Sequence, residues 1–229
     1  MYIQCYLNEH GDQIAVFANV KGGKTVPSWW KECKNLFMSE LEIEIQKMMS
    51  GELYDATDNR VLLAELERCH DLCYDYNHLR PSQVDERTAL MRRLLGHTGA
   101  RFKIISPFLC DYGFNISIGE NFFANANLII LDEARVTFGD NVFIAPNCAF
   151  YTAGHPLDVE RRNAGMEYSL PITVGDNVWI GGNVCVMPGV TIGSNTVIGG
   201  GSVVTHDIPA GVLAAGNPCR VIRQIESTK

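Results

Sequence analysis

The sequence predicts a mainly β protein, a parallel β-helix of hexapeptide repeats preceded by a helical subdomain. Between Pro171 and Ile208, aliphatic residues recur at every sixth position, and a second apolar or small residue follows each of them four positions later. The first set is Val174, Ile180, Val186, Ile192, Ile198 and Val204. Such a period is typical of coils in which three short strands form the sides of a triangular prism. Residues 38–97 instead space their apolar residues three and four apart, as helices do.

Each repeat supplies a strand whose outer two residues point into the prism and whose middle residue points out. Three strands complete a coil, so residues eighteen apart stack on one face. The expected stacks are Trp179 over Val197, Cys185 over Val203 and Thr173 over Thr191, with Phe143 and Thr137 continuing the Trp179 and Thr173 faces. Two outer faces are therefore apolar and one is polar. Apolar faces need a cover, which favours oligomerisation or a docked helix.

The repeat also predicts where the chain turns. Gly175, Gly181, Gly193 and Gly199 follow the second inward residue of a strand, where we expect a tight corner that only glycine takes without strain. The β-helix should span residues 98–215 in four to five coils, with an inserted loop at 151–170 and a C-terminal tail at 216–229.

The composition limits the possible functions. The 229 residues are 46% hydrophobic, enough for a core, and the net charge of -7 is offset by no basic block, which disfavours a nucleic-acid partner. No apolar run approaches the roughly 18 residues of a membrane span. The eight cysteines are dispersed without a CxxC pair, and no signal sequence precedes them, so we expect reduced thiols and a cytoplasmic protein.

The region before the repeats is expected to contain an extension and helices. Residues 1–37 could form two strands around Gly11-Asp12, with KGGKTVP as a linker, or a loosely attached extension; we assign them no function. In residues 38–97, Leu41, Ile45 and Met48 share a helical stripe. A second helix should be capped by Thr57 or Asp58, and a third should run from Pro81 to Gly96. These helices are candidates to cover one face of the prism.

Cys69, His70 and Cys73 could indicate a metal site. Both cysteines, however, lie on the core stripe of the second helix with Leu62, Leu66 and Tyr76, whereas His70 points elsewhere and no fourth ligand is near. We therefore expect core packing and no metal ion.

The inserted loop carries the best candidate for chemistry. His155 lies in Gly154-His155-Pro156, where the proline favours an extended backbone at the lip of the loop. An imidazole is a competent general base at neutral pH. The alternative is a solvated loop histidine.

Several segments closely resemble the maltose and galactoside O-acetyltransferases of the hexapeptide-repeat acyltransferase superfamily. They include GELYDATDN, CDYGFNISIGENFFANANLIILD, TAGHPLD, RRNAGMEYSLPITVGDNVWIGG and AAGNPCRVI, and the resemblance covers about residues 48–225. It implies a left-handed β-helix, a homotrimer with active sites between subunits, and direct transfer of acetyl from acetyl-CoA to a sugar hydroxyl without a metal.

The resemblance also implies roles for individual residues. His155 would remove the proton of the acceptor hydroxyl, Asn125 would lie beside the reacting groups, and the N–H of Gly182 would stabilise the oxyanion. The family often has serine at Gly182, so a hydroxyl is absent here. Glu167 is our candidate to hold the other nitrogen of the His155 ring; galactoside enzymes carry methionine there, and a solvated carboxylate is the alternative. For Asn125, the alternative is a corner asparagine with positive φ.

Further positions match the substrate and cofactor sites of the family. Asp111, Phe123 and Asp132 match the acceptor pocket, with a tyrosine hydroxyl of the galactoside enzymes missing at Phe123. Asp55 and Asp58 compete for one further acidic sugar contact. The residues that match the cofactor side are Gly182, Gly200, Gly201, Thr205, Arg220 and Arg223. Arginine suits nucleotide phosphates because its fork pairs with phosphate oxygens and keeps its charge.

Three other functions remain open. The same fold could acetylate an amine or an antibiotic, or it could be a non-catalytic trimer or a zinc enzyme resembling the γ-class carbonic anhydrases. The zinc alternative needs several converging histidines, and the coils contain only His155 and His206. Covalent catalysis by Cys148 or Cys185 is disfavoured because no histidine is adjacent to Cys185 in its coil.

Overall fold

The structure, a computed structural model, describes residues 3–7, 13–18 and 40–226. The chain forms two compact units, residues 1–46 and 47–229. In the first unit, β1 (Ile3–Leu7) and β2 (Gln13–Ala18) pair antiparallel, with Ile3 opposite Ala18. The expected turn at Gly11-Asp12, the KGGKTVP linker and the side chain of Leu41 lie outside the described residues. The domain boundaries at 37, 97 and 215 stay predictions.

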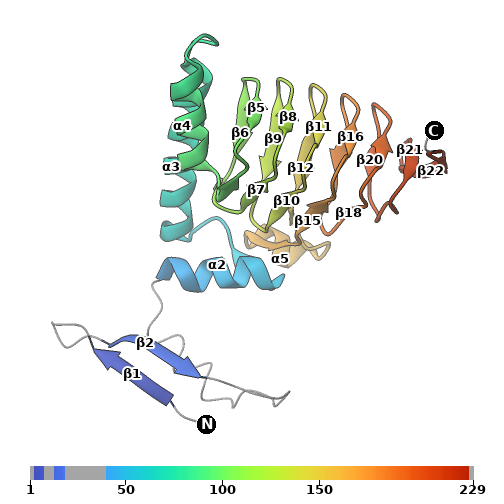
Figure 1. Cartoon of the computed structure of the whole chain (residues 1–229). Helices are drawn as coiled ribbons and strands as arrows, with labels where there is room; N and C mark the ends of the chain where they lie inside the picture. The colour runs from blue at the N-terminus through green and yellow to red at the C-terminus, as the bar shows by residue number, and fades with distance from the viewer. Residues whose placement is uncertain (1–2, 8–12, 19–39, 227–229) are drawn as a thin grey trace. The chain divides into compact units, whose positions relative to one another are not determined.

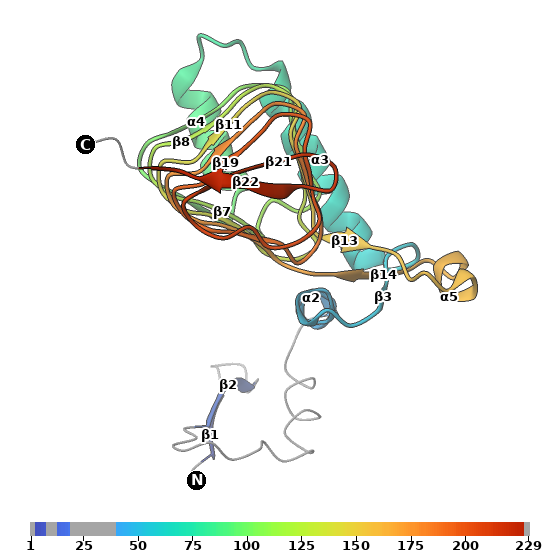
Figure 2. The same cartoon turned by 90° about the vertical axis from the view of Figure 1, so that its right-hand side faces the viewer.

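The repeats form a parallel β-helix with three sheets, one for each face of the prism (Figures 1 and 2). The first face contains β4 (His97–Thr98), β7 (Ile116–Ile118), β10 (Val136–Phe138), β15 (Ile172–Val174) and β18 (Thr191–Ile192). The second contains β5 (Phe102–Ile104), β8 (Phe122–Ala124), β11 (Phe143–Ile144), β16 (Trp179–Ile180), β19 (Val197–Ile198), β21 (Val212–Ala215) and β22 (Arg220–Gln224). The third contains β6 (Phe108–Cys110), β9 (Leu128–Leu131), β12 (Ala149–Tyr151), β17 (Cys185–Val186) and β20 (Val203–Val204).

The expected register is confirmed. Trp179 pairs with Val197 and with Phe143, Cys185 pairs with Val203, and Thr173 lies between Thr137 and Thr191. Inward aliphatic and aromatic residues form one continuous core along the prism. The estimate of four to five coils was low: two faces have five parallel strands each, and the second face adds a sixth, β21. The antiparallel strand β22 closes that sheet, so residues 220–224 of the expected tail are part of it.

The structure corrects the expected reason for the corner glycines. None of the four has a positive φ. That conformation is taken two residues later, by asparagine after Gly175, Gly181 and Gly193 and by Gly201 after Gly199; asparagines also take it at other corners of the prism. These asparagines are Asn121, Asn127, Asn141, Asn147, Asn177, Asn183 and Asn195. Four of them also form a ladder, in which the amides of Asn121, Asn141 and Asn177 donate over 3.0–3.1 Å to the next asparagine, ending at Asn195. The glycines are instead required because the next coil passes too close for a side chain.

We expect Gly175→Ala to destabilise the protein by about 1–3 kcal/mol, because overpacking forces the neighbouring chain to move. A Cβ at Gly175 would lie 2.5 Å from Oγ and 2.7 Å from the backbone nitrogen of Ser194. Gly182→Ala is the control, since the nearest atom to its Cβ is 3.3 Å away. Thermal unfolding measures both, and equal midpoints would contradict the close-approach explanation.

The helices are α2 (Glu40–Ser50), α3 (Arg60–His78), α4 (Val84–Leu94) and the short α5 (Val159–Asn163). The expected caps were wrong. Asn59 caps α3 by accepting from the N–H groups of Val61 and Leu62, because Thr57 and Asp58 are engaged in a turn around the Asp55 carboxylate. The third helix begins at Val84 rather than near Pro81, which lies in the preceding turn.

α3 and α4 cover the end of the prism at its first coil, not an outer face (Figure 1). Cys69, Cys73 and Tyr76 of α3 pack into the same core as the inward residues of that coil, and the Tyr76 hydroxyl donates to the carbonyl of Ile104. The two apolar outer faces therefore stay uncovered by this helical pair. Among the described helices, none is both long and apolar enough to cross a membrane.

Candidate active site

The inserted loop projects from one corner of the prism and is held by a small sheet (Figure 2). β13 (Ala153–Gly154) pairs with β14 (Met166–Ser169), and β14 pairs with β3 (Tyr54–Asp55). Asp158 caps α5 within the loop by accepting from the N–H of Arg161 at 2.9 Å. The loop is therefore an ordered element, and His155 follows directly after its first strand.

Both nitrogens of the His155 ring face an oxygen acceptor. Nδ1 is 3.3 Å from the carbonyl oxygen of Met166, and Nε2 is 3.5 Å from Oε1 of Glu167. The Glu167 side chain is 20% exposed and the histidine 54%. An Nδ1–H donated to Met166 leaves Nε2 as the basic nitrogen. The Glu167 carboxylate thus lies beside Nε2 itself, and not beside the ring nitrogen opposite the basic one, as the sequence analysis expected.

Tyr54 was missed by the sequence analysis. It is almost fully buried, pairs with Glu167 in the small sheet, and donates its hydroxyl to Oε2 of Glu167 at 2.9 Å. Burial and the charge of Glu167 raise the pKa of Tyr54, so the phenol stays a donor. Tyr54 is 113 positions away from Glu167, and nothing in the sequence indicates that the two side chains meet, although Tyr54 lies in the family-like segment GELYD.

Of the expected acceptor residues, Asp111 and Asp132 lie at the same corner but differ in access. Asp132 is fully buried, and its Oδ1 accepts from the N–H groups of Asp111 and Tyr112. Through these bonds the Asp132 carboxylate holds the 111–112 turn in place, and its expected contact with a sugar stays a prediction. Asp111 remains partly exposed, with Oδ1 3.4 Å from Nε2 of His70. Glu133, also missed, accepts from the Thr152 hydroxyl at 3.2 Å.

Burial raises the pKa of Asp132 to about 7, and no described residue pairs with its Oδ2. In the unfolded chain an aspartate ionises near pH 4, whereas the folded protein keeps Asp132 protonated up to about pH 7. The contribution of Asp132 to the free energy of unfolding therefore becomes less favourable as the pH rises from 4 to 7. We expect Asp132→Asn to gain stability relative to wild type across this window, by at most roughly 4 kcal/mol above pH 7. Urea unfolding of both proteins at several pH values measures the difference, and a pH-independent difference would contradict the assignment.

A second group of candidates lies along another edge of the prism. The Gly182 edge lies between the second and third faces and consists of residues 125–126, 145–146, 181–182 and 199–200. The His155 edge lies between the third and first faces and consists of residues 111–115, 132–135, 152–171, 187–189 and 205–207. On the Gly182 edge, the Asn125 side chain accepts from the N–H of Ala126 at 2.8 Å. Asn125 has no positive φ, so the corner-asparagine alternative is wrong. Phe123 lies beside Phe143 on the second face, with ring centroids 6.5 Å apart.

The backbone of the Gly182 edge offers open hydrogen-bond donors. Neither the Gly182 nor the Gly200 N–H has an acceptor among the described residues, whereas the matching amides of Asp140 and Asp176 on another edge are capped by side chains of Asp176 and Ser194. With no side chains of their own, both glycines leave these amides accessible. Arg220 pairs with Ala215 at the same edge, and Arg223 pairs with Leu213. Neither arginine forms an ion pair within residues 40–226.

One chain does not bring all the candidates together. His155, Glu167, Asp111 and Thr205 belong to the His155 edge, whereas Asn125, Gly182 and Gly200 belong to the Gly182 edge, next to Arg220 of β22. The whole third face separates the two edges. The Thr205 hydroxyl is 2.8 Å from Nδ1 of His206. Cys148 is buried and donates to the carbonyl of Gly181, which does not suit a nucleophile.

Comparisons with known proteins agree with this architecture. A model of the maltose acetyltransferase hexapeptide capping motif matches residues 47–99, and a model of six bacterial transferase hexapeptide repeats matches residues 171–206. A putative acetyltransferase of Saccharomyces cerevisiae, YJL218W, is 55% identical over 79% of this chain and 92% of its own length. Galactoside O-acetyltransferase of Escherichia coli is 53% identical over 67% of this chain and 76% of its own.

Solved structures show the same relationship. A maltose O-acetyltransferase from Clostridium difficile superposes with a TM-score of 0.79 at 48% identity, covering 80% of this chain and 98% of that one. A galactoside acetyltransferase in complex with coenzyme A gives 0.77 at 47% identity, covering 80% and 91%. The fold and the capping helices define an acyltransferase of the hexapeptide-repeat class. Within that class, the chain belongs to the family of maltose and galactoside O-acetyltransferases.

Proposed function

We propose that this chain transfers the acetyl group of acetyl-CoA directly to a hydroxyl of a sugar, with His155 as the general base. The observation that carries the proposal is the setting of His155: one ring nitrogen faces a backbone carbonyl, and the other faces a carboxylate held by the buried Tyr54. This arrangement orients the ring and leaves Nε2 as the basic nitrogen. Coenzyme A in the related galactoside acetyltransferase supports the donor.

The reaction needs no covalent enzyme intermediate. Nε2 of His155 accepts the proton of the sugar hydroxyl while its oxygen attacks the thioester carbonyl. The resulting oxyanion accepts a hydrogen bond from the N–H of Gly182, which has no acceptor among the described residues. The carbon–sulfur bond then breaks, and the thiolate of CoA takes the proton back from the imidazolium.

The site is completed between copies of a homotrimer. The base is on the His155 edge and the proposed oxyanion donor on the Gly182 edge, so neither edge alone provides both. The outward residues of the second face supply an apolar surface, with Phe143 50% and Trp179 57% exposed. A cyclic trimer sets one edge of each copy against the other edge of its neighbour and covers such a face.

Each substrate would be bound by residues that come from both edges. Gly182 and Gly200 leave room for the pantetheine arm, and Thr205 adds a hydroxyl. Arg220 and Arg223 have no carboxylate partner within residues 40–226 and would pair with the nucleotide phosphates. Asp111, Asn125 and Phe123 line the acceptor side, where a carboxylate and an amide suit sugar hydroxyls. Glu133, beside Thr152, joins this polar group.

Release of free CoA from acetyl-CoA, measured with a panel of sugars, tests the proposal. The panel should contain glucose, maltose and a galactoside, with an amine and chloramphenicol as acceptors of other classes. Turnover that depends on a sugar and yields its O-acetyl ester supports the proposal. Turnover with the amine or the antibiotic and with no sugar would contradict it.

A further inference from the structure

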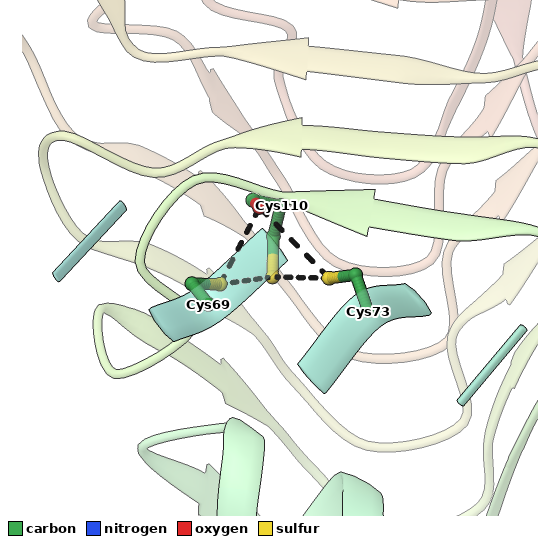
Figure 3. A group of neighbouring side chains, drawn as sticks. All are labelled: Cys69, Cys73 and Cys110. Carbon is green, nitrogen blue, oxygen red and sulfur yellow. Dashed lines mark hydrogen bonds between the residues drawn. The ribbon is translucent and has the colours of Figure 1, made fainter. Parts of the chain in front are cut away.

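Three buried sulfurs converge where α3 meets the first coil of the prism (Figure 3). Cys69 and Cys73 come from successive turns of α3, and Cys110 comes from the end of β6. The Cys110 sulfur is 3.5 Å from that of Cys69 and 3.8 Å from that of Cys73, and all three lie within 4.8 Å of one another. Each residue is at most 1% exposed and none is in a disulfide.

We propose that these cysteines form a thiolate site for one soft metal ion, Cu(I) or Zn(II), separate from the acetyl-transfer site. The expectation of no metal rested on His70 pointing elsewhere and on the absence of further ligands. His70 does turn away, toward Asp111, but Cys110 provides a sulfur that only the folded chain brings near. Thiolates select these metals in proteins, whereas Mg(II) and Ca(II) prefer oxygen.

The spacing of the sulfurs suits a shared metal ion. Metal–sulfur bonds of about 2.3 Å place tetrahedral or trigonal ligands roughly 3.8–4.0 Å apart. The separation of 3.8 Å between Cys110 and Cys73 already lies in that range, and the separation of 3.5 Å between Cys110 and Cys69 needs only a small increase. Two ligands lie four residues apart on one helix face and the third is fixed by a ladder of parallel strands, so both supports are rigid.

The cluster is also prepared to exchange protons for a cation. Cys69 and Cys73 both face the Cys110 carbonyl as thiol donors, at 3.4 and 3.9 Å. Binding forms three metal–sulfur bonds and releases three protons to solvent.

The number of ligands favours Cu(I). Structural zinc sites almost always have four protein ligands, whereas the described residues supply three sulfurs here and full burial leaves little access for water. The ion would tie α3 to β6 and fix the turn that carries Asp111, directly after Cys110. It would thus stabilise the capped end of the prism without entering the transfer reaction.

The test is metal binding to the full chain carrying Cys5→Ser and Cys33→Ser, which removes the two cysteines outside 40–226. The reduced protein is refolded anaerobically with Cu(I) or Zn(II), and bound metal is measured in competition with a chromogenic chelator. We expect one ion per chain, a thiolate-to-metal absorption band in the ultraviolet and a higher thermal midpoint. Cys73→Ala and Cys110→Ala should each weaken binding at least tenfold.

Cys148→Ala is the matched control, because Cys148 is equally buried but lies outside the cluster. Circular dichroism establishes that each variant is folded, and a folded Cys73→Ala protein suffices if Cys110→Ala fails to fold. Binding of either ion that depends on the cluster and not on Cys148 supports the site. Absence of stoichiometric metal after refolding with both ions, or equal binding by Cys73→Ala, would overturn it.

Discussion

Replacing His155 by alanine should lower kcat for sugar acetylation by roughly 10²–10⁴, the usual contribution of a positioned general base. The KM for acetyl-CoA should change little, because the proposed cofactor contacts lie on the other edge of the prism or at Thr205. Steady-state release of CoA with a saturating sugar measures both parameters. The loss should be far larger than that caused by removing Glu167, which acts on the acceptor through the His155 ring.

His97→Ala is the control, since His97 is an exposed histidine of β4 outside both groups of candidates. It should retain wild-type turnover. A His155→Ala protein that keeps more than a tenth of the wild-type kcat would remove His155 from the role of base. The assignment of Glu167 and Tyr54 as its supports would then fail as well.

Charging the second face should abolish activity by separating the subunits. The double substitution Phe143→Asp and Trp179→Asp places two carboxylates among stacked apolar residues that are half exposed in one chain. Burying such charges in an interface is prohibitively costly, so we expect monomers. Because the monomer lacks a complete site, turnover should fall to background.

Light scattering coupled to size-exclusion chromatography measures the assembly. The matched control is Thr137→Asp with Thr173→Asp, which occupies paired positions on the polar first face. This control should remain a trimer with normal turnover. An intact trimer carrying both charges on the second face would show that this face is not the interface.

Much of the fold follows from the sequence because the β-helix is a local, repeating structure. Once Val174 and Ile192 point inward, the eighteen-residue coil fixes Thr173 over Thr191, and no distant contact is needed. The caps were less predictable. Thr57, Asp58 and Asn59 are all good N-caps, and only the turn around Asp55 decides among them. The corner glycines were located correctly, but their cause, the approach of the next coil, is a tertiary fact.

The candidate site was predictable where a motif is local. His155, Glu167 and Gly182 stand in one segment whose resemblance to the family is strong. The hydrogen bond from the Tyr54 hydroxyl to Glu167 joins residues 113 positions apart, and the contact between Cys110 and Cys69 joins residues 41 positions apart. Neither pairing has a sequence signal, because each depends on how the helical cap and the loop pack on the coils. The burial of Asp132 likewise follows from its bonds to the neighbouring coil.

The central claim is that each active site takes its base from one copy and its oxyanion donor from the next. Co-expression of His155→Ala with Gly182→Trp, each with its own affinity tag, tests it, since tandem purification yields only mixed trimers. In a cyclic trimer one of the three sites then has both intact edges, so we expect about one third of wild-type activity from two inactive parents. Mixed trimers as inactive as their parents would contradict a site shared between subunits.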